Sequence, residues 1–303
     1  MSRTDVYETV TNAIAAAIEK GFSGETFEMP WHGMSEIPQN ASTQKAYRGI
    51  NVPLLWITQL DRGFKSGIWA TYKQWEELGA QVRKGEKSTQ IIFWKQYEAD
   101  QDSEAANEED NKIRMFVRHS AVFNADQVDG FEIPENPKPA EILQIESCTN
   151  FVEQTGAIIE HGHDGACYQI STDKIKMPEM ALFRATKHST ATENYYSTLL
   201  HELTHWSGAA NRLDRFSQGK FTEKKEYAFE ELVAELGAAM LCASLGVTSS
   251  PRQDHAHYIG SWLKALGNDK RFIFSAATAA QKAVDYLYDF QPSTPAAEMA
   301  VAA

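Results

Sequence analysis

Apolar residues recur at helical spacing in several separate stretches of the chain. In the first stretch, Val6, Val10, Ile14 and Ile18 are four residues apart, which predicts an amphipathic helix over residues 4–21. Comparable patterns predict further helices at 51–60, 71–79, 140–155, 227–241 and from about residue 255 onward.

Other stretches have the pattern of strands. Residues 113–123 alternate between apolar and polar positions, and residues 88–94 follow a turn and also read as a strand. The acidic stretch 98–111 lies between them, so we expect a hairpin whose strands are joined by a solvated acidic loop. Shorter strands are expected near 157–161 and 167–170. Helices and strands together predict an α+β fold.

The length of the chain predicts more than one domain. A chain of 303 residues is long for a single hydrophobic core. Prolines cluster at 134–139, which is the composition expected of a linker. We therefore expect a mixed helix and hairpin domain at 1–130, a linker at 131–139, a helix-rich domain at 140–290 and a flexible tail at 291–303.

The pentapeptide HELTH at 201–205 is the motif with the clearest chemical meaning. Thr190 and Glu193 have the spacing of a capping box, and Gly208 is a residue type that commonly follows the end of a helix. Leucines and a tryptophan recur around the motif at helical spacing, and no proline interrupts the run. The motif is therefore predicted to lie on a packed helix.

On such a helix, His201 and His205 lie one turn apart on one face, where both imidazoles can reach one metal ion. Glu202 lies about 100° round the helix, where it can accept a proton from an activated water, as in zinc peptidases. The pattern alone is a modest signal, because a surface helix with two solvated histidines would share it. Zn²⁺ is the expected ion and Mn²⁺ the alternative. Arg212 and Arg215, just downstream, either contact a substrate or pair with acids of the next helix.

A catalytic zinc site needs a third protein ligand and one open position. The predicted helix at 227–241 offers Glu230, Glu231 and Glu235. Its Glu-x-x-Ala-Glu pattern resembles the Glu-x-x-x-Asp helix of gluzincin-type peptidases, in which the first carboxylate binds zinc and the second orients a metal-bound histidine. The resemblance implies that Glu231 is the ligand and Glu235 the outer partner. Glu230 and Glu235 remain alternative ligands.

Charge is distributed unevenly along the chain. The formal net charge of −12 taken alone would argue against a nucleic-acid partner. However, seven acids lie within 98–111, whereas residues 41–97 carry nine basic and four acidic residues. The basic stretch therefore has a local charge opposite to that of the whole chain.

The basic stretch is also rich in aromatic residues. Cations can follow phosphates while flat rings stack on unpaired bases, so this composition favours binding of single-stranded nucleic acid. The alternative is that the tryptophans are core residues. The candidate nucleic-acid contacts are the aromatic and basic residues Tyr47, Arg48, Trp69, Tyr72, Lys73, Trp75, Arg83, Lys84 and Lys87.

Cysteine usage and the N-terminal composition indicate a cellular compartment. The three cysteines have no ligand-like spacing and do not suggest a disulfide framework. Residues 1–20 lack the apolar core of a signal peptide, and no apolar run is long enough for a membrane span. We therefore expect a cytoplasmic protein with no membrane partner.

Several separate motifs, in order along nearly the whole chain, resemble one family. The N-terminal half is similar to the amino-terminal domain of ArdC antirestriction proteins, which also occurs in TraC-type plasmid primases, at 47–56, 69–75, 79–88 and 123–127. The C-terminal half is similar to that family's zincin-like metallopeptidase domain at 195–206, 212–215 and 231–235.

This resemblance implies a plasmid- or phage-borne protein that binds single-stranded DNA and protects incoming plasmid DNA from host restriction after conjugation. Two mechanisms are then open. In the first, the protein is a zinc metallopeptidase whose unknown protein substrate could be a component of a restriction system. In the second, it is a module that coats DNA, performs no proteolysis and uses the metal only to stabilise its fold.

Overall fold

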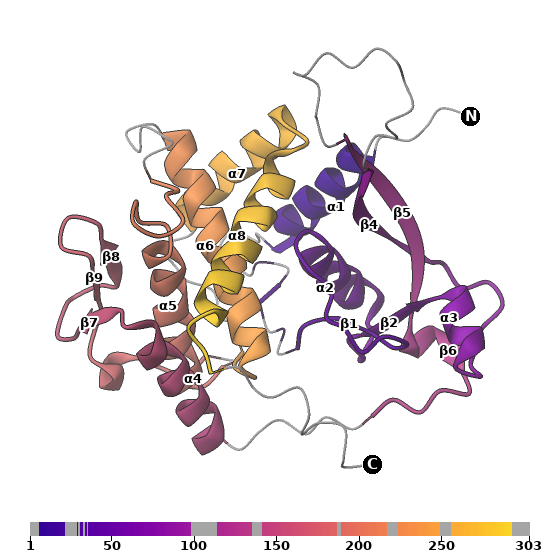
Figure 1. The fold of residues 1–303 in the computed structure, drawn as a ribbon, viewed down its shortest axis with the longest axis horizontal. Coiled ribbons are helices and arrows are strands. Elements are labelled where there is room, and N and C mark those ends of the chain that lie inside the picture. The colour runs from indigo at the N-terminus through magenta and orange to yellow at the C-terminus, as the bar shows by residue number, and fades with distance from the viewer. Residues whose placement is uncertain are drawn as a thin grey trace. The chain divides into compact units, whose positions relative to one another are not determined.

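A computed structural model describes most of the chain (Figure 1). The described residues are 6–21, 29, 31–32, 34, 36–97, 114–134, 141–186, 189–216, 224–248 and 256–292. They form two compact units. The helical unit comprises residues 1–37 and 136–303, and the hairpin unit comprises residues 38–135. The predicted acidic loop at 98–111 and all but two residues of the predicted tail at 291–303 lie outside the described residues.

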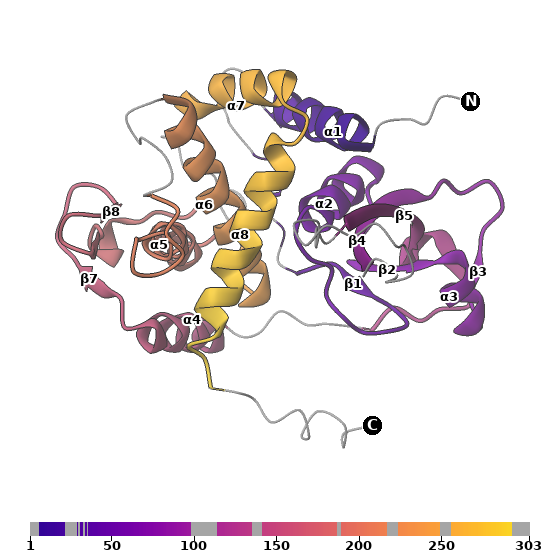
Figure 2. The same ribbon diagram turned by 45° about the horizontal axis from the view of Figure 1, so that its top comes forward.

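Helix α6 (Lys224–Ser244) is the central element of the helical unit. It packs against three other helices, and its residues from Leu232 to Leu236 are buried. Figure 2 shows α8 running alongside α6. The remaining helices of the unit are α1 (Val6–Gly21), α4 (Glu141–Thr155), α5 (Ala191–Trp206), α7 (Ala256–Asn268) and α8 (Phe272–Tyr288).

Helix α5 begins as its sequence predicts. The side chain of Thr190 accepts a hydrogen bond from the backbone N–H of Glu193, and the Glu193 side chain accepts one from the backbone of Thr190. The second Glu193 carboxylate oxygen accepts the backbone N–H of Thr248, just after α6. This buried glutamate therefore both caps α5 and joins it to the end of α6.

Helices α5 and α6 approach closely at a glycine. A Cβ atom added to Gly237 would lie 2.6 Å from Cγ2 of Thr204, which is nearer than such atoms approach. Thr204 is itself fully buried. The absence of a side chain at Gly237 therefore lets α6 lie near α5 and brings the glutamates of one helix beside the histidines of the other.

A small sheet lies beside α5. It contains β7 (Ile158–Glu160), β8 (Cys167–Gln169) and β9 (Lys174–Lys176) in the order β7-β9-β8. Strand β7 is parallel to β9, and β8 is antiparallel to it. Strand β8 is thus an edge of this sheet, and it contacts α5.

The first residues of the chain belong to the helical unit. The hydroxyl of Thr11 on α1 donates to the backbone oxygen of Lys270, and the rings of Tyr7 and Phe274 are 4.7 Å apart. Helix α1 packs mainly against α7, and the apolar stripe of α1 covers α7. We expected residues 1–37 in the N-terminal domain, whereas these contacts group them with the helices of residues 136–303.

The hairpin unit is built on a four-stranded sheet in the order β1-β2-β5-β4. Strands β4 and β5 pair antiparallel from Thr89 opposite Val122 to Tyr97 opposite Arg114, so the predicted hairpin is present. The strands are β1 (Gln39–Asn40), β2 (Ile68–Thr71), β4 (Thr89–Tyr97) and β5 (Arg114–Asn124). A separate two-stranded sheet pairs β3 (Gln81–Val82) with β6 (Val128–Asp129).

Two short helices pack on these sheets, namely α2 (Asn51–Arg62) and α3 (Tyr72–Glu77). The buried side chain of Asn51 holds α2 to β4, because its amide donates to the backbone oxygen of Ile92 and accepts the Ile92 N–H. With its helices and sheets, the molecule has the predicted α+β fold. Among the described residues no helix has the length and apolar character needed to span a bilayer.

Candidate functional site

The two histidines of the HELTH motif converge on one point. They lie on the same face of α5, and their Nε2 atoms are 3.1 Å apart. His201 is buried and His205 is nearly so. The surface-helix alternative considered from sequence, with two solvated histidines, therefore does not describe this helix.

Glu231 of α6 faces both of these nitrogens. One carboxylate oxygen is 3.5 Å from Nε2 of His201, and the other is 3.6 Å from Nε2 of His205. One ligand atom from each of the three residues lies within 4.8 Å of the others. Of the three candidate glutamates on α6, Glu230, Glu231 and Glu235, Glu231 is the one whose carboxylate faces both Nε2 atoms.

This set of atoms fits a divalent metal ion. Two zinc–nitrogen bonds of about 2.0–2.1 Å that meet at a tetrahedral angle separate their nitrogens by about 3.3 Å. The observed Nε2–Nε2 separation of 3.1 Å is close to that value. Two imidazoles and one carboxylate are also the donors of zinc sites that keep an open position for water. His201, His205 and Glu231 could therefore hold a catalytic metal.

The other two glutamates lie behind the histidines. An oxygen of Glu235 is 3.7 Å from Nδ1 of His201, and an oxygen of Glu230 is 3.2 Å from Nδ1 of His205. A carboxylate behind a ligating histidine fixes the orientation of its ring. Glu235 thus lies where the resemblance to gluzincins places an outer partner. Glu230, an alternative ligand from sequence, occupies the equivalent outer place at His205.

Arg215 holds Glu230 in place. Its guanidinium donates to both carboxylate oxygens of Glu230, at 2.7 and 2.9 Å, and also to Ser207 Oγ and the backbone oxygen of Thr204. Burial alone would raise the pKa of Glu230, but His205 and Arg215 outweigh it and keep that pKa below its ordinary value. Of the two roles open to Arg215 from sequence, pairing with an acid is the one observed.

Charges of opposite sign stabilise one another at the centre. Burial opposes protonation of His205, yet its hydrogen bonds to Glu230 and Glu231 outweigh that effect and raise its pKa to about 10. For Glu231, burial is again outweighed, and the two histidines keep its pKa far below the ordinary value. The carboxylate of Glu231 is therefore ionised, as a metal ligand must be, whereas His205 has to release its proton before it can bind a metal.

Glu202 is held by the edge strand of the small sheet. Its carboxylate accepts a hydrogen bond of 2.8 Å from the backbone N–H of Tyr168 on β8, and the side chain is buried. Tyr168 and Asp173 in turn bind Arg212, whose guanidinium lies over the ring of Trp206. No sequence pattern indicates that Tyr168 reaches Glu202, because the contact joins residues 34 positions apart.

Three of the aromatic residues proposed as DNA contacts are buried in the hairpin unit. Trp69 and Trp75 are 0% exposed, and Tyr47 is also buried. The indole N–H of Trp75 donates to the backbone oxygen of Phe123, and the Tyr47 hydroxyl lies between Asn40 and Trp69. These rings offer no open face to a base, so the expectation that they stack on DNA is corrected here: they are core residues.

The other residues proposed to contact DNA are exposed, but some of them already interact with other side chains of the protein. Arg83 donates to Glu86, Asp129 and the backbone oxygens of Asp126 and Val128, so it joins the loop after β3 to β6. Lys73 lies 3.5 Å from Glu77. The exposed residues of the predicted set are Arg48, Tyr72, Lys73, Arg83, Lys84 and Lys87.

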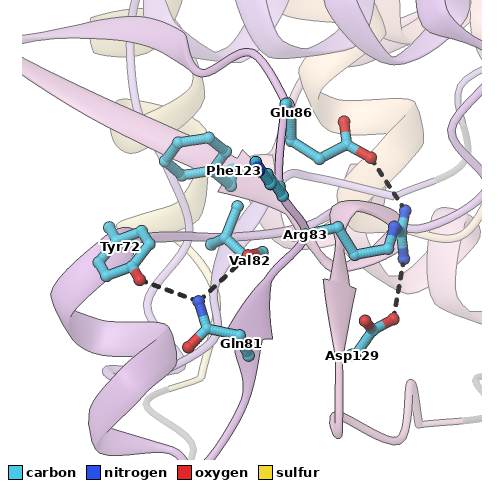
Figure 3. Close-up of a pocket in the computed structure, with 9 residues that line it drawn as sticks. Tyr72, Gln81, Val82, Arg83, Glu86, Phe123 and Asp129 are labelled. Atoms are coloured by element: carbon cyan, nitrogen blue, oxygen red, sulfur yellow. Dashed lines mark hydrogen bonds and ion pairs between the residues drawn. The ribbon is translucent and has the colours of Figure 1, made fainter.

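Tyr72 and Arg83 line one cavity of about 560 Å³ in the hairpin unit (Figure 3). The rings of Tyr72 and Phe123 form part of its wall, and the amide of Gln81 donates to the Tyr72 hydroxyl at 2.9 Å. Figure 3 shows Arg83 between Glu86 and Asp129 on another side. The cavity thus combines exposed aromatic surface, an amide and paired charges.

Two family models match the chain. Residues 4–123 match the N-terminal domain of the anti-restriction factor ArdC, and residues 146–279 match a zincin-like metallopeptidase. The second match includes the HELTH helix and Glu230, Glu231 and Glu235 of α6. The first match begins within the segment that folds with the helical unit and extends into β5.

Similar proteins cover nearly the whole chain. Uncharacterized protein y4eC of Sinorhizobium fredii is 44% identical over 291 residues, which is 94% of this chain and 92% of that protein. DNA primase TraC of Escherichia coli is 38% identical over 302 residues, and the chain spans only 27% of its length.

Solved structures of an antirestriction ArdC protein from plasmid R388 are also similar. The metal-free form has a TM-score of 0.74 and 40% identity, covering 94% of this chain and 97% of that one. The Mn(II)-bound form has a TM-score of 0.73 and 41% identity, covering 94% of this chain and 98% of that one.

Proposed function

Because the chain belongs to the ArdC family of antirestriction proteins, we propose that it protects incoming plasmid DNA from host restriction. It does so in the cytoplasm, where it binds single-stranded DNA through the hairpin unit and cleaves a protein substrate with the helical unit. The observation that carries the peptidase assignment is the convergence of His201, His205 and Glu231, with Glu202 next to His201 on α5.

In the proposed reaction His201, His205 and Glu231 hold the metal. When bound, a divalent ion lowers the pKa of a water and polarises a carbonyl oxygen. Glu202 accepts the proton of the attacking water and returns it to the leaving amine. The hydrogen bond from the Tyr168 N–H fixes one of its oxygens for this task. We propose Zn²⁺ as the ion, and the Mn(II)-bound R388 structure keeps Mn²⁺ as the alternative.

The decisive variant is Glu202→Gln. The amide keeps the volume and an oxygen that can accept the Tyr168 N–H, but it cannot act as a base. We expect the full-length variant to bind metal normally and to lose about 100- to 10,000-fold in peptidase rate. Establishment of unmodified plasmid in a restricting host should fall to the level seen without the protein. Glu153→Gln, an exposed acid on α4, is the matched control.

Full protection by a metal-loaded Glu202→Gln protein would contradict the peptidase mechanism. The remaining account would then be the second one considered from sequence, a DNA-coating module with a structural metal. Loss of metal in the Glu202→Gln protein would instead show that Glu202 helps to hold the ion.

The DNA-binding proposal is supported by the cavity beside Tyr72. Tyr72 is 49% exposed, so its ring can stack on an unpaired base, and Lys84 lies at the same cavity to meet a phosphate. We expect Tyr72→Ala to weaken binding of a labelled single-stranded oligonucleotide by about 5- to 150-fold, from the 1–3 kcal/mol of one stacked base. Fluorescence anisotropy over a salt series measures this change.

Tyr227→Ala is the matched control for Tyr72→Ala, because Tyr227 is a comparably exposed tyrosine in the helical unit. The slope of log affinity against log salt concentration should be shallower in the Lys84→Ala variant, by the amount expected for about one fewer released counterion. Unchanged affinity in both the Tyr72→Ala and the Lys84→Ala proteins would exclude this cavity as the DNA site.

A further inference from the structure

A histidine far upstream of the motif reaches the metal centre. The Nε2 atom of His32 lies 2.6 Å from a carboxylate oxygen of Glu235, and their side chains are only 5% and 6% exposed. The two residues are 203 positions apart in the sequence but belong to the same helical unit. His32 is also absent from the motifs that indicated a metal site, because no spacing pattern connects it to α5 or α6.

The proton on His32 can be assigned from two of its neighbours, Met29 and Glu235. The backbone N–H of Met29 donates to Nδ1 of His32 at 2.9 Å, so Nδ1 acts as the acceptor and carries no proton. The single proton of the neutral ring is then on Nε2, which donates it to Glu235. Buried neighbours hold this turn in place, since Met29 and Trp31 are 2% and 0% exposed.

Glu235 connects this hydrogen bond to a ligand. Its first oxygen accepts the His32 proton, and its second oxygen lies 3.7 Å from Nδ1 of His201. An outer partner restricts the carboxylate, and the carboxylate in turn restricts the ring that holds the metal. The geometry therefore forms a chain from Met29 through His32 and Glu235 to His201.

We propose that His32 is a positioning residue of the metal centre, which fixes Glu235 so that His201 presents Nε2 to the ion. This inference rests on the proposed function, since it assumes that His201 is a ligand. The metal centre is then not contained within residues 140–290 alone. The segment around His32, inside the span that matches the ArdC N-terminal domain, completes it.

Two amide variants in the full-length protein separate the two hydrogen bonds of His32. The His32→Gln side chain places an amide N–H near the position of Nε2, so it keeps the bond to Glu235. The His32→Asn side chain ends near the position of Nδ1, so it can keep the Met29 bond but cannot reach Glu235. The two variants therefore differ mainly in the hydrogen bond to Glu235.

The measurement is the Mn²⁺ dissociation constant, from the electron paramagnetic resonance signal of free Mn²⁺ during titration. Thermal unfolding of the metal-free proteins is recorded alongside. We expect His32→Asn to weaken Mn²⁺ binding by about 10- to 100-fold and His32→Gln to retain it within about threefold. Both variants should unfold at similar temperatures without metal, because each keeps one hydrogen bond and the buried position.

His201→Ala distinguishes failure of this inference from failure of the proposed function. If His201→Ala abolishes Mn²⁺ binding while His32→Asn binds as tightly as the natural chain, His32 is not a positioning residue. If affinity in the two amide variants simply follows their unfolding temperatures, the role of His32 is structural and the inference is also overturned. If His201→Ala binds Mn²⁺ normally, the metal centre itself is wrongly placed.

Discussion

At the residue scale, the role of each glutamate follows from the nitrogen that it faces. Glu231 faces the two Nε2 atoms, whereas Glu230 and Glu235 lie behind the rings at Nδ1. The sequence restricted the choice to these three acids, because they are the carboxylates of one predicted helix. Periodicity alone could not separate Glu230 from Glu231, since adjacent positions differ by about 100° and the rotation of α6 against α5 is set by packing; only the resemblance to gluzincins favoured Glu231.

The sequence was least informative about which aromatic residues are buried and which are exposed. Trp69 and Trp75 are in a polar and basic stretch, yet their rings are completely buried. Composition indicates which residue types are near one another in the chain, but the direction of a side chain depends on the face of its strand or helix. Tyr72 and Trp75 lie on the same short helix, three positions apart, and only Tyr72 reaches solvent.

A pH-dependent contribution to stability is expected from Asp173. Arg212 donates hydrogen bonds to Asp173 and holds the pKa of its carboxyl below the ordinary value. A lowered pKa in the folded state adds stability above the unfolded-state pKa of about 4, and that stability is lost as pH falls through the folded-state pKa. Because Asp173 is 48% exposed, the contribution should be below about 1 kcal/mol.

Urea unfolding of the natural chain and Asp173→Asn checks this expectation. The difference in free energy of unfolding should be present at pH 7 and shrink as pH is lowered from 4 toward 2.5. A difference that is the same at every pH would mean that the pair contributes through packing and not through the charge of Asp173.

At the element scale, the position of α6 against α5 depends on Gly237. We expect Gly237→Ala to destabilise the fold by about 1–3 kcal/mol, because the new methyl group would lie 2.6 Å from Thr204 Cγ2. Chemical denaturation measures the loss. Since the displaced helix carries Glu231, metal affinity should fall as well.

Gly260→Ala is the matched control for the Gly237→Ala variant. Gly260 lies inside α7, and a Cβ atom there would meet nothing within 4 Å. Alanine should be neutral or stabilising by up to about 1 kcal/mol at that position, from its higher helix propensity. Equal effects at the two glycines would show that close helix packing is not the reason for Gly237.

The positions of the helices and of the hairpin could be predicted from the sequence, whereas the tertiary contacts between them could not. The capping box at Thr190 predicts where α5 begins, and the stripe of α1 and the strands β4 and β5 match their expected positions. These features depend on local patterns. The contacts of Glu202 with Tyr168 and of Glu235 with His32 depend on tertiary packing, so no periodicity could indicate them.

At the scale of the whole molecule, the two compact units do not coincide with the two halves of the sequence. Residues 1–37 fold with the helices of the metal centre, while residues 38–135 form the hairpin unit with the candidate DNA surface. The linker expected at 131–139 stays a prediction. A family match that begins at residue 4 therefore includes a segment of both units.

The central claim is that His201, His205 and Glu231 together hold a divalent metal. Anomalous diffraction from crystals of the full-length protein grown with Mn²⁺ tests it most directly. The account predicts one strong anomalous peak in bonding contact with Nε2 of both histidines and with the Glu231 carboxylate. A peak bound by Glu230 or Glu235, or no peak at these atoms at saturating Mn²⁺, would contradict it.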